Sequence, residues 1–430
     1  MWEEIPPGTS AHSQAEVFSL AVESLNCKEC GASYELGAAF FCESCFGPLE
    51  VRYDHSGLDA VELKRKIQAG SRGIWRYADF LPFAEGERPG DPLEPGMTPL
   101  VKADRLAERL GLGEVWVKND AANPTHSFKD RVVAVAVAKA KELGFETVAC
   151  ASTGNLANAV AAHAAAAGLD SYVFVPSDLE EQKLLATGVY GTKLVGIRGN
   201  YDDVNRLCTE LAAERPWAFV NVNLRAYYAE GSKTLAYETI EQLGWTLPDR
   251  IVGPIASGSM FTKLGRGISE WLEIGLVEGE LPIFCGAQAE GCSPVATAFA
   301  DGSDVCKPQK PDTIAKSLAI GDPADGPYAL DLARSTAGAI ESVDDDEIRA
   351  GIRLLAETTG IFTETAGGVT VGVLAKLAEQ GAIDPGERVV VYITGEGLKT
   401  LDAVRDSFQM HEIDPTLESF EREFAPAQVA

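Results

Sequence analysis

The fold class of this chain is decided by residues 147–167, which read TVACASTGNLANAVAAHAAAA. The stretch opens with a short apolar run at 147–151, which is typical of a buried strand. After a polar turn it becomes an alanine-rich helix at 156–167. Other apolar runs and amphipathic stretches alternate along the chain in the same way. Strands that alternate with helices of about 10–15 residues predict parallel sheets with helices on both faces, so we expect an α/β protein.

The predicted elements cover most of the chain from residue 96 onward. Strands are expected at 115–118, 147–151, 172–175, 193–197, 218–222, 251–255, 283–286, 339–343 and 389–393. Helices are expected at 131–143, 156–167, 201–213, 233–243, 345–358 and 370–379. Residues 82–99 predict a linker and residues 301–312 a surface loop, because both are rich in turn-forming residues. The residues after Met410 are acidic and show no periodicity.

Composition limits the functions that this chain can have. It has 430 residues, 46% of them apolar and 23% charged, so it can bury a large core. Its 64 acidic and 37 basic residues give a net charge of −27. An acidic surface repels nucleic acids and anionic membranes, so we expect neither as a partner. Residues 1–19 lack the pattern of a secretory signal, and no apolar run reaches the ~18 residues of a membrane span, which predicts a cytoplasmic protein.

Four of the nine cysteines form two Cys-x2-Cys pairs: Cys27, Cys30, Cys42 and Cys45. Two such pairs can place four thiolates tetrahedrally around one Zn2+. A site filled by four sulfurs has no open coordination position, so it is structural rather than catalytic. The alternatives are ordinary buried cysteines, disulfides or a redox pair. We predict a small zinc ribbon that precedes the main body of the protein.

Four loops that follow predicted strands carry groups suited to anions or to a cofactor. The loop at 123–131 places Lys129 at a helix start, where its amine suits Schiff-base formation with a carbonyl cofactor. The loop at 151–156 suits a carboxylate, and the Gly/Ser loop at 255–260 suits a phosphate. The loop at 394–399 offers a threonine hydroxyl for a ring nitrogen. Each loop alone also fits an ordinary helix cap or an exposed lysine, but together they indicate a pyridoxal-phosphate site.

These motifs resemble those of the fold type II pyridoxal-phosphate enzymes, and most closely those of the threonine synthase family. Residues 123–131 read Asn-Pro-Thr-His-Ser-Phe-Lys-Asp-Arg and are similar to that family's lysine segment. Other family segments resemble residues 151–155, 230–234, 360–368 and 394–399. The resemblance spans residues 25–405. It implies two α/β domains with mostly parallel sheets, and the conversion of O-phospho-L-homoserine and water to L-threonine and phosphate.

The resemblance also implies a role for each matching residue. Lys129 would hold pyridoxal phosphate covalently and then shuttle protons. The other cofactor contacts would come from Asn155 at the 3′-oxygen, from Ala256, Ser257, Gly258, Ser259 and Met260 at the phosphate, and from Thr394 at the ring nitrogen. The substrate contacts would come from Ser152, Thr153 and Gly154 at the carboxylate, and from Ser127 and Arg225 at the leaving phosphate.

Departures from the family pattern concern the substrate. His126 stands where glycine is usual, so its ring either enters the pocket or packs beneath it. Tyr228 stands where the pattern has an arginine, and Arg225 is the candidate to replace that arginine, the alternative being a surface role. Lys118 is the other candidate, unless it is a structural cation at a strand end. We expect the anionic ligands to be held by the cations Lys118, Arg131, Arg225 and Lys233.

The predicted organisation is an N-terminal tail at 1–20, a zinc ribbon at 21–55, a linker at 56–95, a large cofactor-binding domain at 96–145 and 225–410, a small substrate-closing domain at 146–224 and an acidic tail at 411–430. We expect a homodimer that binds a small amino-acid phosphate. One alternative function is another fold type II enzyme, such as cysteate synthase or serine/threonine dehydratase. The other is a non-catalytic binding protein on a retired enzyme fold, which the presence of Lys129 opposes.

Overall fold

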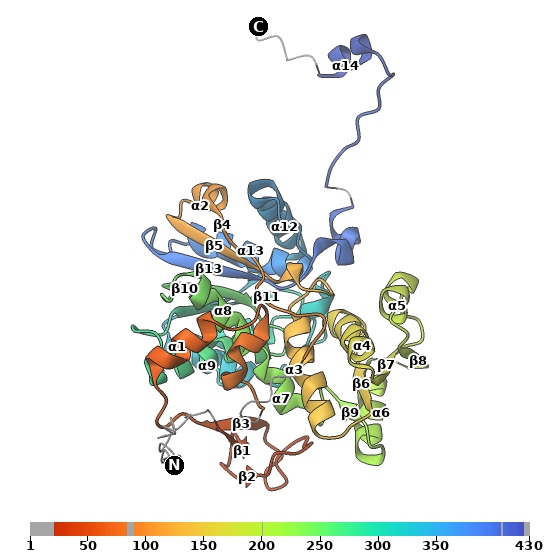
Figure 1. Cartoon of the computed structure of the whole chain (residues 1–430). Helices are drawn as coiled ribbons and strands as arrows, with labels where there is room; N and C mark the ends of the chain where they lie inside the picture. Colours follow the sequence, from red (N-terminus) through yellow and green to blue (C-terminus); the bar gives the residue numbers. More distant parts are fainter. Residues whose placement is uncertain (1–20, 84–89, 200, 406, 425–430) are drawn as a thin grey trace, which may run out of the picture.

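The main body of the molecule contains two mainly parallel sheets, and the smaller one lies at the right in Figure 1. The structure is a computed structural model that describes residues 21–83, 90–199, 201–405 and 407–424. The larger sheet has the strand order β12-β11-β10-β13-β5-β4. Its strands are β4 (Leu100–Lys102), β5 (Glu114–Asn119), β10 (Arg250–Pro254), β11 (Ile283–Ala289), β12 (Ile340–Val343) and β13 (Arg388–Ile393). Its neighbouring strands are parallel except β4 and β5, which are antiparallel.

The smaller sheet is entirely parallel and has the order β8-β7-β6-β9. Its strands are β6 (Thr147–Ala151), β7 (Asp170–Pro176), β8 (Lys193–Ile197) and β9 (Ala218–Phe219). In sequence it is inserted between β5 and β10 of the larger sheet. The chain therefore leaves the larger sheet, builds the smaller one and returns, so that loops from both sheets can meet.

Helices cover both faces of the larger sheet. The α-helices are α1 (Ala60–Gln68), α2 (Asp104–Leu110), α3 (Lys129–Glu142), α4 (Asn155–Ala167), α5 (Glu181–Gly188), α6 (Tyr201–Glu214), α7 (Arg225–Glu230), α8 (Lys233–Gln242), α9 (Ser259–Ile274), α10 (Pro294–Ala300), α11 (Gly326–Ser335), α12 (Asp345–Thr359), α13 (Thr365–Glu379) and α14 (Leu417–Phe424). Short 3-10 helices are η1 (Ile74–Phe80), η2 (Asp120–Ala122), η3 (Lys316–Leu318) and η4 (Gly397–Val404). Along β13, Val389 and Val391 pack with α2, α12 and α13, whereas Val390 and Tyr392 pack with α3, α8 and α9. This alternation is the period of a strand whose two faces are both buried.

A third, antiparallel sheet lies at the N-terminal end of the described chain. It has the order β2-β1-β3, with β1 (Ala21–Cys27), β2 (Ser33–Tyr34) and β3 (Leu49–Asp54). In Figure 1 it lies below α7, away from the smaller sheet's β8. Its strands carry buried Leu25, Leu49 and Val51, which join the core around α7 to α9. The ribbon is therefore packed on the body of the protein.

Each predicted strand and helix corresponds to an element of the structure, and three differences stand out. Helix α13 begins at Thr365 instead of residue 370, because Gly367 and Gly368, which have a low helix propensity, lie inside it. A Cβ on Gly368 would come within 2.6 Å of the Ile348 carbonyl oxygen, so this glycine serves helix packing. The segment 56–95 contains α1 and η1, and the aperiodic reading of the tail is wrong because α14 lies in it. The predicted tail at 1–20 lies outside the described residues.

Among the helices of the described ranges, none combines the length and the apolar character needed to cross a membrane.

Candidate active site

Lys129 is the first residue of helix α3, and its side chain is half-buried. The residue before it, Phe128, makes no side-chain bond to the first N–H groups of the helix. Lys129 Nζ donates a hydrogen bond to the phenol oxygen of Tyr228 at 2.7 Å. The same nitrogen lies 4.6 Å from the ring centre of Phe128. The amine is thus accessible and is held by a neighbour that the sequence had not linked to it.

His126 adopts a backbone conformation that favours glycine. Its φ is +63°, in the left-handed region, where the family pattern has a glycine. Its side chain is exposed. The interpretation that the ring packs beneath the pocket is therefore wrong, and a contact with substrate stays a prediction.

The loop at 394–399 lies directly against the lysine segment. The Phe128 N–H donates to the Thr394 carbonyl oxygen at 2.9 Å, and Ser127 forms an isolated antiparallel bridge with Gly395. Thr394 and Ser127 are both buried. Among the described residues, no group is within hydrogen-bonding reach of the Ser127 hydroxyl oxygen. A buried hydroxyl without a partner indicates a position for a ligand atom.

Asn155 opens helix α4 and lies between two charged side chains. Its Nδ2 donates to both carboxylate oxygens of Glu364, at 3.1 and 3.0 Å, and its Oδ1 accepts from Lys399 Nζ at 2.7 Å. Burial raises the pKa of Glu364, against the opposing hydrogen bond from Asn155 and the charge of Lys399. Burial lowers the pKa of Lys399. Four of the segments singled out in the sequence, including those at 360–368 and 394–399, therefore meet at one place.

The predicted carboxylate loop joins β6 to α4. Ser152 is buried and Gly154 is exposed, and the Gly154 N–H lies 3.4 Å from Ser152 Oγ. Helix α4 has no side-chain cap, so its first N–H groups are left for other acceptors. Together with the partial positive charge of a helix N-terminus, this arrangement suits a carboxylate.

The predicted phosphate loop at 256–260 opens helix α9 and also requires glycine. Gly258 has a φ of +96°, and a Cβ on it would lie 2.7 Å from the Asp325 carbonyl oxygen. The Asp325 N–H donates to the Ser257 carbonyl oxygen at 2.8 Å. The carboxylate of Asp325 binds Arg225 Nη2 at 2.8 Å. Arg225 thus lies beside this loop, with 31% of its side chain exposed.

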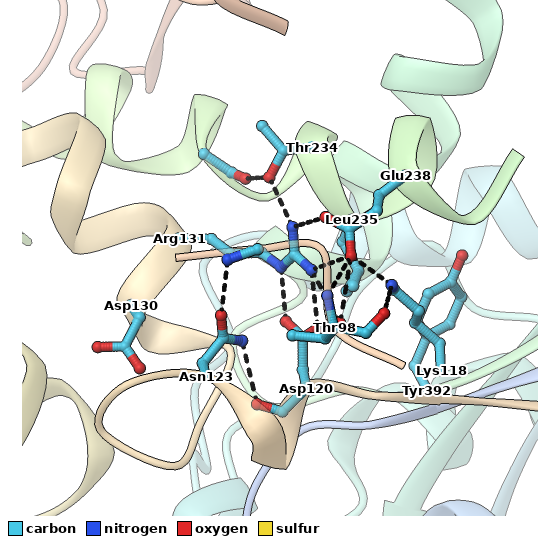
Figure 2. Close-up of polar contacts among 12 residues, drawn as sticks. Thr98, Lys118, Asp120, Asn123, Asp130, Arg131, Thr234, Leu235, Glu238 and Tyr392 are labelled. Atoms are coloured by element: carbon cyan, nitrogen blue, oxygen red, sulfur yellow. Dashed lines mark hydrogen bonds and ion pairs between the residues drawn. The ribbon is translucent and has the colours of Figure 1, made fainter. Parts of the chain in front are cut away.

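Two of the cations expected to bind anions are instead buried among carboxylates. Figure 2 shows the Arg131 guanidinium between Asp120 and Glu238, with Lys118 on the far side of Glu238. The Arg131 Nε to Asp120 Oδ2 distance is 2.6 Å, and the Arg131 Nη1 to Glu238 Oε2 distance is 2.8 Å. Lys118 Nζ donates to Glu238 Oε1. All four side chains are fully buried. This network therefore stabilises the start of α3 and is not available to bind a ligand.

Lys233 is also engaged in buried ion pairs. Its Nζ lies 2.7 Å from Glu230 Oε2 and 3.0 Å from Glu270 Oε2. The expectation that Lys118, Arg131 and Lys233 hold anionic ligands is therefore wrong. The acidic partners come from distant parts of the chain, which the sequence could not pair with these cations. Of the four expected cations, Arg225 alone is partly exposed beside a ligand loop.

The four ribbon cysteines come together as their spacing predicts. Their sulfur atoms all lie within 4.8 Å of one another, with Cys27 to Cys45 at 3.4 Å and Cys30 to Cys42 at 3.5 Å. Cys27 and Cys42 are buried, and the other two are exposed. The cluster can hold one metal ion, because four converging thiols at this separation match tetrahedral coordination.

Sequence reasoning did not anticipate three contacts at the site. Tyr228 had been noted only for replacing an arginine, Lys399 only as the end of a motif, and Asp325 not at all. Lys399 could have been found because it lies in the 394–399 segment that the sequence singles out. Asp325 could not, because it reaches Arg225 across 100 residues of chain. Contacts of this kind depend on tertiary structure alone.

Comparison with known proteins identifies the class. A model of the pyridoxal-phosphate dependent enzyme family matches residues 92–395, and the chain belongs to this family. Its fold is shared with a serine racemase from maize, at a TM-score of 0.59 and 19% identity over 73% of this chain and 92% of the other. It is shared too with a fungal L-serine ammonia-lyase from Rhizomucor miehei, at a TM-score of 0.62 and 22% identity over 73% of this chain and 99% of the other.

Sequence relatives narrow the class further. The chain is 37% identical to threonine synthase of Methanocaldococcus jannaschii, over 88% of this chain and 93% of the relative. It is 38% identical to threonine synthase of Methanosarcina acetivorans, over 89% of this chain and 93% of the relative. Within the pyridoxal-phosphate lyases, the chain therefore belongs to the threonine synthase family.

The described residues fit pyridoxal phosphate as the cofactor. Lys129 provides an accessible amine at the start of α3. Gly258 shapes a turn that a Cβ would obstruct, at the start of an uncapped helix suited to a phosphate.

Proposed function

We propose that this chain converts O-phospho-L-homoserine and water to L-threonine and phosphate. The observation that carries the proposal is the 37% identity to a threonine synthase over 88% of this chain. The contacts that join the lysine segment to the loops of Asn155 and Lys399 support it. When bound, pyridoxal phosphate supplies an electron sink for the pair left behind as a C–H bond of the amino acid breaks.

Lys129 is the residue that holds the cofactor and moves the protons. It opens helix α3, and the N–H of the preceding Phe128 donates to the Thr394 carbonyl oxygen. Further cofactor contacts are assigned to Asn155, to the loop at 256–260 and to Thr394. Glu364 and Lys399 hold the Asn155 amide in one orientation, because one accepts from its nitrogen and the other donates to its oxygen.

The substrate is bound at both ends. Ser152, Thr153 and Gly154, with the α4 N-terminus, bind the carboxylate. Ser127 and Arg225 bind the leaving phosphate. Arg225 suits this task because its guanidinium has five N–H donors in a fork that matches phosphate oxygens, and Asp325 already orients it.

Zinc is the metal that we assign to the four ribbon cysteines. A closed set of four sulfur ligands favours Zn2+ and a structural role. The remaining five cysteines are buried. We assign the chain to the cytoplasm, because the Cys-x2-Cys pairs suit a metal better than disulfides. We also propose that the substrate is a small amino-acid phosphate and that the chain forms a homodimer.

Substrate choice is tested by product analysis. Purified chain loaded with pyridoxal phosphate is given either O-phosphohomoserine or O-phosphoserine, and released phosphate and threonine are measured. Threonine formed from O-phosphohomoserine, with no comparable turnover of O-phosphoserine, is the expected result. Comparable phosphate release from O-phosphoserine contradicts the proposal and favours a cysteate synthase or related activity.

The role of Lys129 is tested by absorbance. Lys129→Ala should abolish the visible band of the lysine-bound cofactor and the activity together. Lys141→Ala is the matched control, because this exposed lysine lies near the other end of α3. A cofactor band that survives in Lys129→Ala contradicts the assignment.

A further inference from the structure

Tyr228 is the closest polar neighbour that the structure gives Lys129. Its phenol oxygen accepts a hydrogen bond from Lys129 Nζ at 2.7 Å. Nζ also lies 5.3 Å from the centre of the Tyr228 ring, so the amine is beside the ring edge that carries the hydroxyl. Only 8% of Tyr228 is exposed. A phenol held this close to the amine can control the direction in which the amine points.

Helix α7, which carries Tyr228, is anchored on every side. Arg225 binds Asp325 at one end, and at the other Glu230 binds Lys263 at 2.7 Å. Between them, the hydroxyl of Tyr227 donates to the Gly37 carbonyl oxygen of the ribbon at 3.0 Å. The two ion pairs hold both ends of α7, so the Tyr228 hydroxyl keeps its place relative to α3 without the Tyr227 hydroxyl.

Arg225 and Tyr228 are three residues apart on α7 and therefore lie on one face of the helix. Arg225 binds Asp325, which contacts the phosphate loop, and Tyr228 contacts Lys129. One helical turn thus spans the distance between the phosphate loop and the amine. Tyr228, which stands where the family pattern has an arginine, therefore contacts Lys129.

We propose that Tyr228 is a positioning residue for Lys129, which orients the amine during proton transfer. The inference rests on the proposed role of Lys129. Tyr228 accepts one N–H of the amine, which restrains rotation about the Cε–Nζ bond and leaves the nitrogen lone pair aimed into the site. When the substrate C–H bond breaks, its proton forms a new N–H bond on Lys129, and the electron pair left behind would be taken up by the electron sink that the bound cofactor supplies. That proton is later returned to carbon, and Tyr228 contributes only its hydrogen bond to the amine.

The test compares two tyrosines on one helix. Tyr228→Phe removes the hydroxyl that contacts Lys129, and Tyr227→Phe removes a neighbouring hydroxyl that contacts only the ribbon. Three quantities are measured for each variant: the absorbance band of the bound cofactor, kcat and KM for O-phosphohomoserine, and the exchange of the α-hydrogen of L-threonine with deuterium from solvent, followed by NMR.

We expect Tyr228→Phe to keep the cofactor band and a KM within about threefold of the original chain, while kcat and the exchange rate both fall. The fall should be about 10- to 100-fold, the range for small misplacements of a reacting group. Tyr227→Phe should leave the exchange rate unchanged. A purely structural role would not lower kcat and exchange selectively while the cofactor and substrate still bind.

Two results would overturn the inference. The first is an unchanged exchange rate in Tyr228→Phe, and the second is an equal loss in Tyr227→Phe. Exchange requires no phosphate release, so it separates this inference from the choice of substrate. If exchange persists in Lys129→Ala, the proposed role of Lys129 falls and the positioning role falls with it.

Discussion

At the scale of single residues, the cations of this chain divide by burial. Lys118, Arg131 and Lys233 are fully buried and paired with carboxylates. Removing one partner of such a pair typically costs about 3–5 kcal/mol, because a buried charge is left alone. Arg225 differs because, within the described residues, Asp325 is its one carboxylate partner, which leaves other N–H groups of the guanidinium open. This difference is what makes Arg225 available to a ligand.

Arg225→Ala should raise the KM for O-phosphohomoserine by about 10- to 100-fold, the equivalent of one hydrogen bond to a charged group. Phosphate release at varied substrate concentration measures this. Arg206→Ala is the control, because that arginine is exposed on α6 and pairs with Asp203 and Glu210 of the same helix. Equal KM values for the two variants would show that Arg225 does not bind the substrate phosphate.

At the scale of elements, the N-terminal ribbon supports the helices of the site. The Tyr53 hydroxyl donates to Glu230 Oε2 at 2.7 Å. Lys263 of α9 lies 3.1 Å from Glu50 of β3 and 2.7 Å from the same Glu230. Since Glu230 ends α7, the ribbon, α7 and α9 share one buried set of charges. Loss of the ribbon would expose these charges and loosen α7.

Metal removal should therefore weaken both the ribbon and the site. The purified chain is expected to contain one zinc per chain by atomic spectroscopy, and Cys42→Ser should lose it, because a four-ligand site needs every thiolate. We expect earlier proteolysis within residues 21–55 and a lower Tm. Cys306→Ser, outside the cluster, is the control. Full zinc content in Cys42→Ser would refute the assigned site.

At the scale of the whole molecule, His163 joins parts of the chain that are far apart in sequence. It lies on α4, next to the smaller sheet, and is 2% exposed. Its Nε2 is 3.0 Å from Asp130 of α3, and its Nδ1 is 2.9 Å from Asp91. Burial alone would lower the pKa of His163, but its contacts with Asp130 and Asp91 outweigh burial and raise the pKa to about 9.

This raised pKa predicts how stability depends on pH. The histidine binds its proton more tightly when folded than at its ordinary value of 6.5, so its contribution is complete below pH 6.5 and is lost as pH rises through about 9. His163→Asn should remove this part of the pH dependence, on the order of 1–3 kcal/mol. Urea unfolding at several pH values measures it, with the exposed His411→Asn as control. Parallel curves for the original chain and His163→Asn would contradict the prediction.

The sequence by itself determined the alternation of strands and helices, the four-cysteine cluster and the loops that carry Lys129, Asn155, Gly258 and Thr394. It could do so because periodicity, spacing and helix-start chemistry are local properties of the chain. The tertiary structure alone decided which charges meet. Tyr228 reaches Lys129 across 99 residues, and Glu238 reaches Arg131 across 107. Such pairs are set by how the two sheets and the ribbon pack, so local sequence carries no signal for them, and they decide which cations remain free to bind a substrate.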